Sequence, residues 1–598
     1  MRPGVKLCVA MSLGLALGHL QAAELLRNGS FENGQAAWGR LGSRVILSSA
    51  PDAPPGLHAL RVEGRSQRSD GPVQDVLTAL REAGSGRRLV ARLHVKLDQP
   101  ASVRARIEFM DDTGLKRIIL AEKVVREAGT WARIEGTAFI SWQGSLREAR
   151  LCFDVARVTE GEYPDYCLAG VSLQPDTDGD RLSDDEERTI GTDPARPDTD
   201  SDDVPDGWER ANGFDPLRDD AGADADGDGF SNQQEYWAAT DPRSTASFPG
   251  KPANPKMNRA AREVLRFLAL LPSRKEKRVV VGQHVTEIDP EYETQVVALQ
   301  RQTGKWPGLL SVQYEGHRKP LQVAEANRCV LDYWKQGGLV KIKWRAHDPW
   351  TGLPNYQRPA RGQPDRVDIP GLLDPAHSTS PQNREANRRA HEVYLGWLSS
   401  IAEGLKELRR AGVVVLWRPC SEMNGAWFWW GRRSQQDYLA LWRHQYQYLT
   451  VEHGLDNLLW VYESASGVHD MVPSDYYYPG DEYVDVMGHN LYDKTWNLPF
   501  EANDLYRDYP KVYAFPQAGT AHGQGKPTDG SWDNLTYINQ IRVRYPRCSF
   551  FAAWNSFATG GGRVPVRLAI VDNPHAKELL EDPWIVTRDR LDWRISER

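Results

Sequence analysis

The chain has 598 residues, of which 40% are hydrophobic and 26% charged, and its formal net charge is -7. This length exceeds what one hydrophobic core usually contains, so we expect several folded domains. The charge is uneven, because residues 176–241 contain 18 Asp and 4 Glu against 5 Arg. Acid concentrated in this way excludes nucleic acid as the partner and indicates a bound cation. The 21 tryptophans favour carbohydrate binding.

Residues 1–23 have the composition of a secretory signal peptide. Arg2 and Lys6 precede an apolar run, and the small residues Ala22 and Ala23 follow it. No other stretch is long and apolar enough to cross a bilayer. We therefore expect an exported protein, either secreted, periplasmic or held at the cell surface, that works as a monomer.

Residues 24–174 alternate short apolar runs with turn residues, which predicts a β-sandwich. Its motifs are NGSFENG at 28–34, LRVEGR at 60–65 and LAGVSL at 168–173. Together they resemble carbohydrate-binding modules of families 4, 9 and 22, which implies a polysaccharide ligand. Cys152 and Cys167 lie in two strand-like runs separated by a turn, so we expect a disulfide across that hairpin.

Residues 175–243 repeat one spacing of acidic side chains in three loops. Oxygen ligands at positions 1, 3, 5, 9 and 12 of a loop wrap a calcium ion, and position 12 supplies a bidentate carboxylate. The GTDP and DPL tails resemble thrombospondin type 3 repeats, so we expect a calcium-stiffened stalk; a flexible acidic linker without metal is the alternative. The predicted ligands are Asp176, Asp178, Asp180, Asp184, Glu187, Asp198, Asp200, Asp202, Asp206, Glu209, Asp224, Asp226, Asp228, Asn232 and Glu235.

A linker rich in Pro, Gly and Ser at 244–256 precedes a long domain, residues 257–598, in which strands and amphipathic helices alternate. Eight such strands predict a (β/α)8 barrel, whose chemistry lies at the carboxyl ends of the strands. One helical pattern covers residues 384–410. The predicted strands are 279–282, 309–312, 340–344, 413–417, 458–461, 484–488, 512–515 and 550–554.

Residues 416–431, which read LWRPCSEMNGAWFWWG, form the stretch around which the domain is organised. Glu422 lies just past the predicted strand 413–417, and four aromatic residues follow at 427–430. An acid beside the scissile bond and flat apolar rings on which sugars stack are what glycoside cleavage requires. Four large aromatic side chains in succession cannot all face one core, so we expect some of them to face a ligand.

This motif, with GQH at 282–284, YYPGDEYVDVMGHNLYD at 477–493 and AAWN at 552–555, resembles glycoside hydrolase family 26 over the whole domain. That family contains β-mannanases, some β-1,3-xylanases and mixed-linkage glucanases. The resemblance implies endo-acting hydrolysis without a catalytic cofactor, in which one Glu is acid and then base and a second Glu is the nucleophile. Glu422 matches the acid/base, Tyr492 the residue that orients the nucleophile, and Trp427 a sugar-stacking tryptophan. Further predicted substrate contacts are Arg418, Asn424, Trp430, His284, Trp344 and Trp554.

Three positions depart from the family pattern. In KVYAFPQAGT, at 511–520, the nucleophile position is occupied by Gln517. Ser421 replaces the His that precedes the acid, and Arg345 replaces a His after Trp344. A carboxamide is uncharged and far less nucleophilic than a carboxylate, and loss of a nucleophile usually lowers the rate by several orders of magnitude.

Four interpretations of this site remain open. In the first, water attacks a polysaccharide directly, with Glu463, Asp348 or Glu315 as base. In the second, Gln517 orients a 2-acetamido group of an N-acetylated substrate, which itself attacks. In the third the barrel only binds glycan, and in the fourth every domain serves adhesion. The retained Glu422 favours the two catalytic interpretations, since a pure binding protein gains little from an acid there.

The segment between His347 and His391 follows the third predicted strand and is rich in Pro, Asp and Arg. Long loops inside compact domains are usually functional, and this one is on the predicted active-site face. We therefore expect it to shape the substrate cleft, with a disordered insertion as the alternative.

Overall fold

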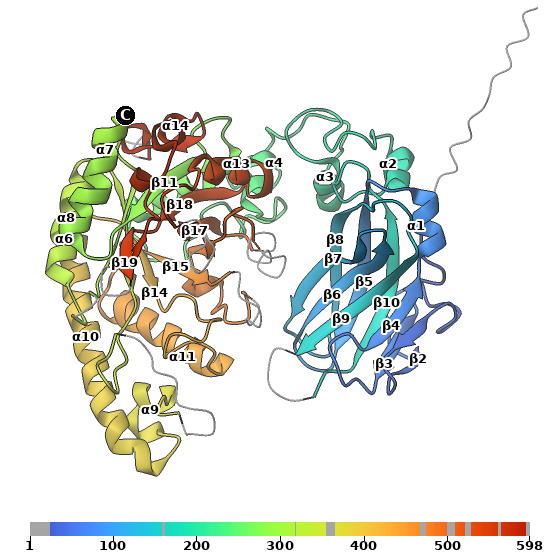
Figure 1. Cartoon of the computed structure of the whole chain (residues 1–598), viewed down its shortest axis with the longest axis horizontal. Coiled ribbons are helices and arrows are strands. Elements are labelled where there is room, and N and C mark those ends of the chain that lie inside the picture. The colour runs from blue at the N-terminus through green and yellow to red at the C-terminus, as the bar shows by residue number, and fades with distance from the viewer. Residues whose placement is uncertain are drawn as a thin grey trace, which may run out of the picture.

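The computed structural model describes residues 24–157, 162–316, 319–354, 365–466, 474–498, 509–520, 528–559 and 564–593. A sandwich of two sheets, on the right in Figure 1, and a barrel, on the left, are joined at the top by the acidic repeats. The predicted signal peptide, residues 1–23, lies outside the described residues. Among the described helices, none combines the length and the apolar character needed to span a membrane.

The sandwich has ten strands in two antiparallel sheets of five. Along β6, every second residue, such as Val103, Ile107 and Phe109, lies in the core between the sheets, as the alternation of side chains along a strand requires. A short helix, α1 (Leu77–Ala83), lies between β4 and β5. The strand order of one sheet is β1 (Gly39–Leu41), β4 (Gly71–Asp75), β9 (Glu148–Arg157), β6 (Ala101–Asp111) and β7 (Gly114–Val125). The order of the other is β2 (Ile46–Ala50), β3 (Ala59–Glu63), β10 (Tyr166–Pro175), β5 (Arg87–Leu97) and β8 (Trp131–Ile140).

The predicted disulfide between Cys152 and Cys167 is wrong, because both thiols are free. Cys152 lies in β9 and Cys167 in β10, and these strands belong to opposite sheets and do not form a hairpin. The residues on either side of each cysteine belong to the core between the sheets. Since side chains alternate across a strand, the two thiols point out of opposite faces of the sandwich.

Each acidic repeat is a loop followed by one short helix, α2 (Asp184–Ile190), α3 (Asp206–Asn212) or α4 (Asn232–Ala238). Ser183 and Ser231 begin α2 and α4 with reciprocal capping boxes, and Gly191 ends α2 in a left-handed conformation. These end signals are local in sequence. They explain why such short helices start and stop where they do.

The barrel closes through eight parallel strands, which confirms the predicted fold class. Strand β14 starts at Val415, later than predicted, because the backbone of Val413 ends the preceding helix by donating to Leu408 O. The strands around the barrel are β11 (Val279–His284), β12 (Leu309–Gln313), β13 (Leu339–Trp344), β14 (Val415–Pro419), β15 (Leu458–Ser464), β16 (Val486–Tyr492), β17 (Val512–Gly519) and β18 (Cys548–Ala553). β11 pairs with both β12 and β18, and the two-residue β21 (Ile585–Val586) adds to β11.

Helices surround the barrel strands (Figure 1). The longest, α10, matches the predicted range of 384–410 and buries one face through residues such as Tyr394, Leu398, Ile401 and Leu405. The α-helices are α5 (Arg259–Leu270), α6 (Ile288–Glu291), α7 (Ala298–Thr303), α8 (Val323–Lys335), α9 (Ile369–Leu373), α10 (Arg384–Arg410), α11 (Gln435–Tyr446), α13 (Leu535–Arg544) and α14 (Ala576–Glu581). A small hairpin of β19 (Phe557–Thr559) and β20 (Val564–Val566) follows β18.

The segment 244–256, predicted as a linker, packs on its neighbours at both ends. Phe248 stacks on Phe230 of the third repeat, with 6.2 Å between ring centroids, and Ala253 N donates to Asp485 Oδ1 of the barrel at 2.7 Å. The sandwich also contacts the barrel directly, because Arg126 donates to Tyr509 Oη at 2.6 Å and pairs with Asp475 at 2.8 Å. The sandwich is thus attached to the barrel by side chains as well as by the chain.

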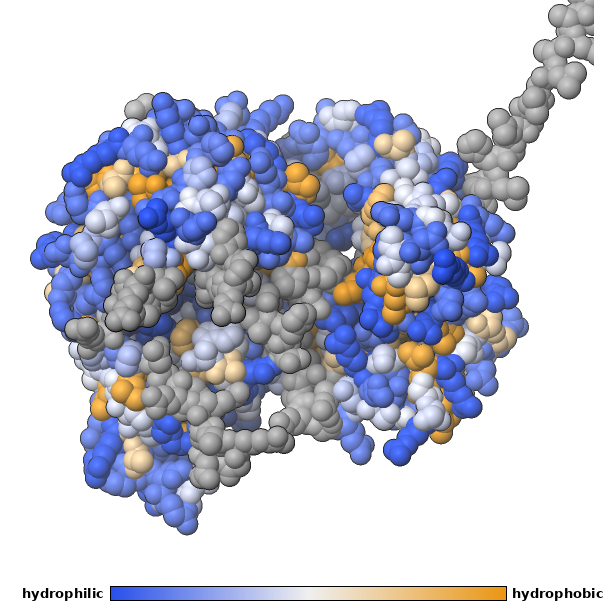
Figure 2. Space-filling model, viewed as in Figure 1, coloured by the Kyte–Doolittle hydropathy of each residue, from blue (hydrophilic) through white to orange (hydrophobic). Residues whose placement is uncertain are grey.

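The face of the molecule in Figure 2 is mainly hydrophilic, and its hydrophobic residues form small separate groups over both domains. Isolated exposed side chains such as Ile46 and Phe139 are of this kind. Scattered apolar residues are normal on a folded protein and do not by themselves indicate an interface.

Candidate active site and calcium-binding loops

Glu422 lies three residues past β14, at the carboxyl end of the barrel strands. Its backbone N donates to Glu463 O of β15 at 2.9 Å, and its φ of 60° lies in the left-handed region. Cys420 also has a positive φ, of 41°. Such strained backbone persists only where the surroundings hold it, and it is frequent at functional sites. The turn therefore aims one carboxylate into the barrel mouth.

The four aromatic residues after Glu422 divide into two pairs. Trp427 is 37% exposed and its Nε1 donates to Glu422 Oε2 at 2.6 Å, while Phe428 is partly buried beside it. Trp429 and Trp430 are buried in the core. Gly425 is required by this arrangement, because a Cβ there would meet the Trp427 ring at 2.2 Å. Only the first pair can offer a ring to a ligand.

Gln517 lies next to Glu422, although 95 residues separate them in sequence. Gln517 Nε2 donates to Glu422 Oε1 at 3.2 Å and to Tyr492 Oη at 2.7 Å. Its Oε1 accepts from Arg418 at 2.8 Å and faces Lys343 Nζ at 3.4 Å. These cations fix the orientation of the amide, so its NH2 group is the end that points at Glu422.

Pro516 explains how Gln517 is turned inward. Pro516 has no N–H to donate, and the pairing of β17 with β18 shifts register between Phe515 and Ala518. A bulge of this kind re-aims the side chain that follows it. On the other edge of β17, Gln517 pairs with Asn490 of β16.

Two lysines and an arginine lie inside the barrel beneath the Glu422 and Gln517 pair. Burial, followed by repulsion from Arg418 and Arg345, lowers the pKa of Lys343 to about 7, and burial lowers the pKa of Arg418 to about 10. Burial also lowers the pKa of Lys341 well below its usual value. The centre of the barrel therefore gathers basic groups whose charged forms are disfavoured by burial.

The three carboxylates considered as an alternative base are not free to act as one. Glu463, Glu315 and Asp348 are all buried, and each pairs with an arginine. The partners are Arg418, Arg345 at 3.6 Å and Arg366, respectively. Each of these carboxylates already lies in an ion pair, so the structure argues against this part of the first interpretation.

Some of the other predicted substrate contacts line the site, and others pack behind it. Trp430 and Trp344 have almost no exposed surface: Trp430 Nε1 donates to Ser421 O at 2.9 Å, and Trp344 stacks on Tyr394 of α10. We correct both to core residues, since neither has a free ring face. Asn424 exchanges two hydrogen bonds with the backbone of Ala465, so it holds the Glu422 turn.

His284 and Trp554 stack on each other with 4.0 Å between ring centroids at the ends of β11 and β18. His284 accepts or donates to Ser311 Oγ at 2.7 Å, and burial with repulsion from nearby cations lowers its pKa well below the usual value, which keeps it neutral. Trp554 is partly exposed and receives Lys343 Nζ on its ring at 4.5 Å. Arg418 is fully buried and orients Gln517.

Lys343 is the site residue that the sequence reasoning missed. The signal was present in the strand KIKWR, where Lys341, Lys343 and Arg345 alternate with Ile342 and Trp344. Trp344 faces α10, so the basic residues on the opposite side of β13 face the barrel interior. Part of the loop predicted to shape the cleft, residues 355–364, lies outside the described residues.

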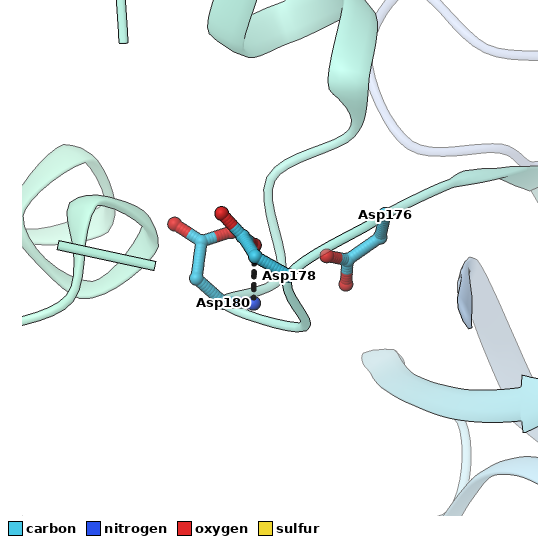
Figure 3. Close-up of side chains that lie close together, drawn as sticks. All are labelled: Asp176, Asp178 and Asp180. Atoms are coloured by element: carbon cyan, nitrogen blue, oxygen red, sulfur yellow. Dashed lines mark hydrogen bonds between the residues drawn. The ribbon is translucent and has the colours of Figure 1, made fainter. Parts of the chain in front are cut away.

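The acidic loops gather carboxylates as the spacing predicts. Figure 3 shows Asp176, Asp178 and Asp180 turned toward a common point, and one carboxylate oxygen of each lies within 4.8 Å of the others. Asp198, Asp200 and Asp202 repeat this arrangement, as do Asp224, Asp226 and Asp228. A further group joins Asp202 and Glu209 to Asp220, which the sequence reasoning did not include.

The position 12 carboxylates are buried beside these groups of aspartates. Glu187, Glu209 and Glu235 are at most 1% exposed, and each has at least one oxygen with no hydrogen-bond partner among the described residues. Burial and neighbouring carboxylates raise the pKa of Glu187 and Glu209 to about 9 and that of Glu235 to about 8. Buried orphan oxygens next to like charges fit a hard cation of high charge.

Position 9 differs from the prediction. Asp184 and Asp206 accept hydrogen bonds from the backbone and hydroxyl of Thr177 and Thr199, so they close the loops and lie outside the carboxylate groups. Asn232 donates to Asp220 O at 3.0 Å, and its Oδ1 is buried without a partner among the described residues. Asn232 therefore remains available as a ligand, whereas the two aspartates serve the loop.

Comparison with known proteins places each part of the chain. Residues 253–590 match the family model for glycosyl hydrolase family 26, residues 23–157 a carbohydrate binding domain model, and residues 176–197 the bacterial TSP3 repeat. Mannan endo-1,4-beta-mannosidase A and B of Caldalkalibacillus mannanilyticus is 33% identical over 362 residues, 58% of this chain and 64% of that protein. Mannan endo-1,4-beta-mannosidase of Bacillus subtilis is 30% identical over 57% of this chain and 89% of that protein. The solved structure of Bacillus subtilis mannanase BCman is 27% identical, covers 57% of this chain and 96% of that one, and has a TM-score of 0.47.

Proposed function

Because its family model matches more than half of the chain, the protein belongs to glycosyl hydrolase family 26, and we propose that it cleaves internal bonds of a β-1,4-mannan or a closely related β-glycan. The observation that carries this proposal is the pair formed by Glu422 and Gln517, 3.2 Å apart at the strand ends, with the exposed Trp427 beside it. The curated relatives act on mannan by name, and the chain covers 64% of the first and 89% of the second.

In this proposal Glu422 is the proton donor. Its carboxyl group gives a proton to the glycosidic oxygen, the C–O bond breaks, and the departing sugar leaves as an alcohol. A water molecule then adds to the anomeric carbon and transfers its proton to the Glu422 carboxylate, which restores the acid. Trp427 Nε1, which donates to Oε2 at 2.6 Å, holds the carboxyl group in place.

Gln517 cannot serve as nucleophile, because its amide is neutral and forms no covalent glycosyl intermediate. Its amide group donates hydrogen bonds to Glu422 and to Tyr492 and so holds both side chains in position. Among the described residues, an uncharged amide lies where a carboxylate would stabilise an oxocarbenium ion, so turnover is expected to be far slower than with two carboxylates.

A barrel that binds glycan without cleaving it is the second candidate. It is favoured by the ion pairs that occupy Glu463, Glu315 and Asp348, which leave Glu422 without a second active carboxylate among the described residues. The substrate-assisted alternative is less well supported. An acetamido N–H would need Gln517 Oε1 as acceptor, and Arg418 and Lys343 already occupy that oxygen.

A screen of released sugars separates these candidates. The full chain is incubated with mannan, xylan, mixed-linkage glucan and N-acetylated polysaccharides, and Glu422→Gln serves as the matched variant because it keeps the shape but cannot give a proton. We expect release from mannan by the parent and none by the variant. Retention of a polysaccharide in affinity gels without release of sugar by either form would overturn the hydrolase and leave the binding barrel.

The acidic loops are proposed to hold structural calcium, and the protein is proposed to be exported. Calcium is supported by the buried orphan oxygens of Glu187, Glu209 and Glu235. Export is supported by the composition of residues 1–23 and by a polymeric substrate that cannot enter a cell intact. Fractionation of the producing cells, with the chain found in the cytoplasm at full length, would overturn the export proposal.

A further inference from the structure

The barrel site gathers four basic side chains, those of Lys341, Lys343, Arg345 and Arg418, around three buried carboxylates, those of Glu315, Glu422 and Glu463, so four formal positive charges face three negative ones. Arg418 pairs with Glu463 and, at 4.0 Å, with Glu422, and Arg345 pairs with Glu315. Lys343 Nζ lies 3.4 Å from the neutral amide of Gln517 and 4.5 Å from the ring of Trp554, and Glu315 and Glu422 attract it from farther away. The surplus charge therefore lies where an amide occupies the nucleophile position.

The basic residues are concentrated by the register of two adjacent strands. Lys343 of β13 is paired with Arg418 of β14, and Lys341 and Arg345 lie two residues to either side on the same face of the chain. Arg345 lies closest to the aromatic pair, 5.8 Å from the Phe428 ring, and is partly exposed. Its guanidinium is thus the cation nearest to where Trp427 and Phe428 would hold a sugar.

The effect of this charge is visible on neighbouring groups. Burial is the first cause of the lowered pKa of Lys343, and repulsion from Arg418 and Arg345 is the next. Lys341, Lys343 and Arg418 act in the same direction on His284. Burial raises the pKa of Glu315, and any protonation there leaves still more positive charge. The site has a positive potential around the Glu422 and Gln517 pair.

We infer that the glycan taken by this barrel carries a carboxylate on the sugar next to Glu422, a β-linked uronate in place of a neutral hexose. The inference rests on the proposed function, because it names the substrate class of the same site. Arg345 is the residue that reaches the carboxylate, and Lys343 and Arg418 supply the field beneath it. A charge-assisted hydrogen bond from arginine to a carboxylate is about twice as strong as a neutral one, so a uronate is favoured over its neutral counterpart.

Binding of a uronate in this way should be accompanied by proton uptake at Lys343. An anion close to a cationic acid raises the pKa of that acid, and Lys343 titrates near neutrality in the free protein. Binding of a uronate near pH 7 therefore takes up part of a proton, whereas binding of a neutral sugar does not. The heat of binding should then depend on the ionisation enthalpy of the buffer for the acidic ligand only.

Two oligosaccharides that differ in one group test the inference. The full chain is titrated calorimetrically with β-1,4-linked mannohexaose and with the hexasaccharide of β-1,4-linked mannuronate, whose rings carry a carboxylate in place of CH2OH. We expect the mannuronate to bind at least about tenfold more tightly, which corresponds to one charge-assisted hydrogen bond. Both ligands are checked for cleavage after the titration.

Variants assign the effect to the cations. Arg345→Gln and Lys343→Met should each reduce the ratio of mannuronate affinity to mannohexaose affinity about tenfold, and Lys343→Met should abolish the buffer dependence. The matched control is Lys335→Met, an exposed lysine at the end of α8 and at the opposite end of the barrel. If a variant does not fold, the comparison of the two ligands on the parent chain still decides.

The outcomes separate this inference from the proposed function. Equal or tighter binding of mannohexaose overturns the carboxylate and leaves a mannan-active barrel intact. Binding of neither oligosaccharide overturns both. A mannuronate preference that persists in Arg345→Gln and Lys343→Met would place the recognition elsewhere on the chain and also overturn the assignment.

Discussion

The acidic loops and the barrel centre both bring side chains of like charge together, carboxylates in the loops and basic groups in the barrel. In the loops, carboxylate oxygens of Asp176, Asp178 and Asp180 lie within 4.8 Å of one another. In the barrel, Lys343 and Arg418 meet over an amide instead of a carboxylate. Burial of like charges is costly unless an opposite charge joins them. On the proposals made above, each region takes a ligand from outside, a cation in the loops and an anion in the barrel.

The difference between the two regions lies in how the charges are assembled. One loop brings together its own neighbours in sequence, at intervals of two residues. The barrel collects its charges from β13, β14 and β15, which helices and loops separate in the chain. A loop can therefore lose its order when its ion is removed, whereas the barrel has a large core and retains its fold with the charge unmatched.

The largest expected effect comes from giving the barrel its own anion. In Gln517→Glu the new carboxylate would lie beside Glu422 and pair with Arg418 and Lys343. We expect mannan hydrolysis to rise by roughly three orders of magnitude or more, measured as initial rates of reducing-sugar release. The preference for mannuronate should fall at the same time, since the cations are then neutralised from within.

The matched control for this variant is Gln336→Glu, an exposed glutamine after α8 that carries the same change of charge. It should leave both quantities unchanged. If Gln517→Glu folds normally but hydrolyses mannan no faster than the parent, the missing carboxylate at position 517 is not what limits catalysis. The contrast drawn here between the loops and the barrel would then be wrong.

Removal of calcium should have the next largest effect. Calorimetric melting with and without an excess of chelator measures this effect. A site that was saturated at a calcium concentration a thousandfold above its dissociation constant should lose about 4 kcal/mol of stability when the ion is removed. Glu209→Gln should remove one ion from the stoichiometry measured by calcium titration. Asp203→Asn, an exposed aspartate of the same loop, is the control and should bind the full number. Identical melting with calcium and with chelator would disprove a metal-stiffened stalk.

Lys343→Met should have the smallest effect, a gain of about 1–4 kcal/mol in the stability of the barrel at pH 7 and below. The pKa of Lys343 is lowered to about 7 in the fold, so at lower pH the folded protein carries a buried charge. Between pH 7 and the ordinary lysine value the unfolded chain binds the extra proton, and the stability of the parent rises with pH. The advantage of the variant should therefore shrink as pH increases.

Urea unfolding followed by tryptophan fluorescence at several pH values measures this difference. Lys335→Met, whose lysine is exposed, should show no such dependence. A variant that is less stable than the parent at every pH would mean that Lys343 contributes more by its contacts than it costs by its charge. The surplus cation of the barrel would then not exist.

The sequence predicts well whatever follows one local rule. The strand-end rule placed Glu422 at the carboxyl end of the barrel strands, and the resemblance to glycoside hydrolase family 26 placed Gln517 opposite it; the structure separates their side chains by 3.2 Å. The repeated spacing of aspartates predicted the carboxylate groups of the loops. The second result depends on spacing alone, which a single chain displays.

The predictions that were wrong or incomplete depended on which face of a helix or strand a residue occupies. Trp430 and Trp344 looked like sugar platforms until packing against neighbouring elements showed both to be core. Cys152 and Cys167 are close in sequence but lie on opposite sheets. Lys343 was missed because its importance comes from partners on other strands, contacts that no local pattern reports.

The Arg126 contact between the sandwich and the barrel has a consequence for long polymers. Its partners are Asp475, between β15 and β16, and Tyr509, which lies three residues before β17 at the amino end of the barrel strands. A polysaccharide bound by the sandwich would thus be held at a fixed distance from Glu422, because the sandwich is not attached through a flexible linker alone. Chains long enough to span both parts gain avidity through the raised effective concentration, and short fragments, which touch one part only, are released.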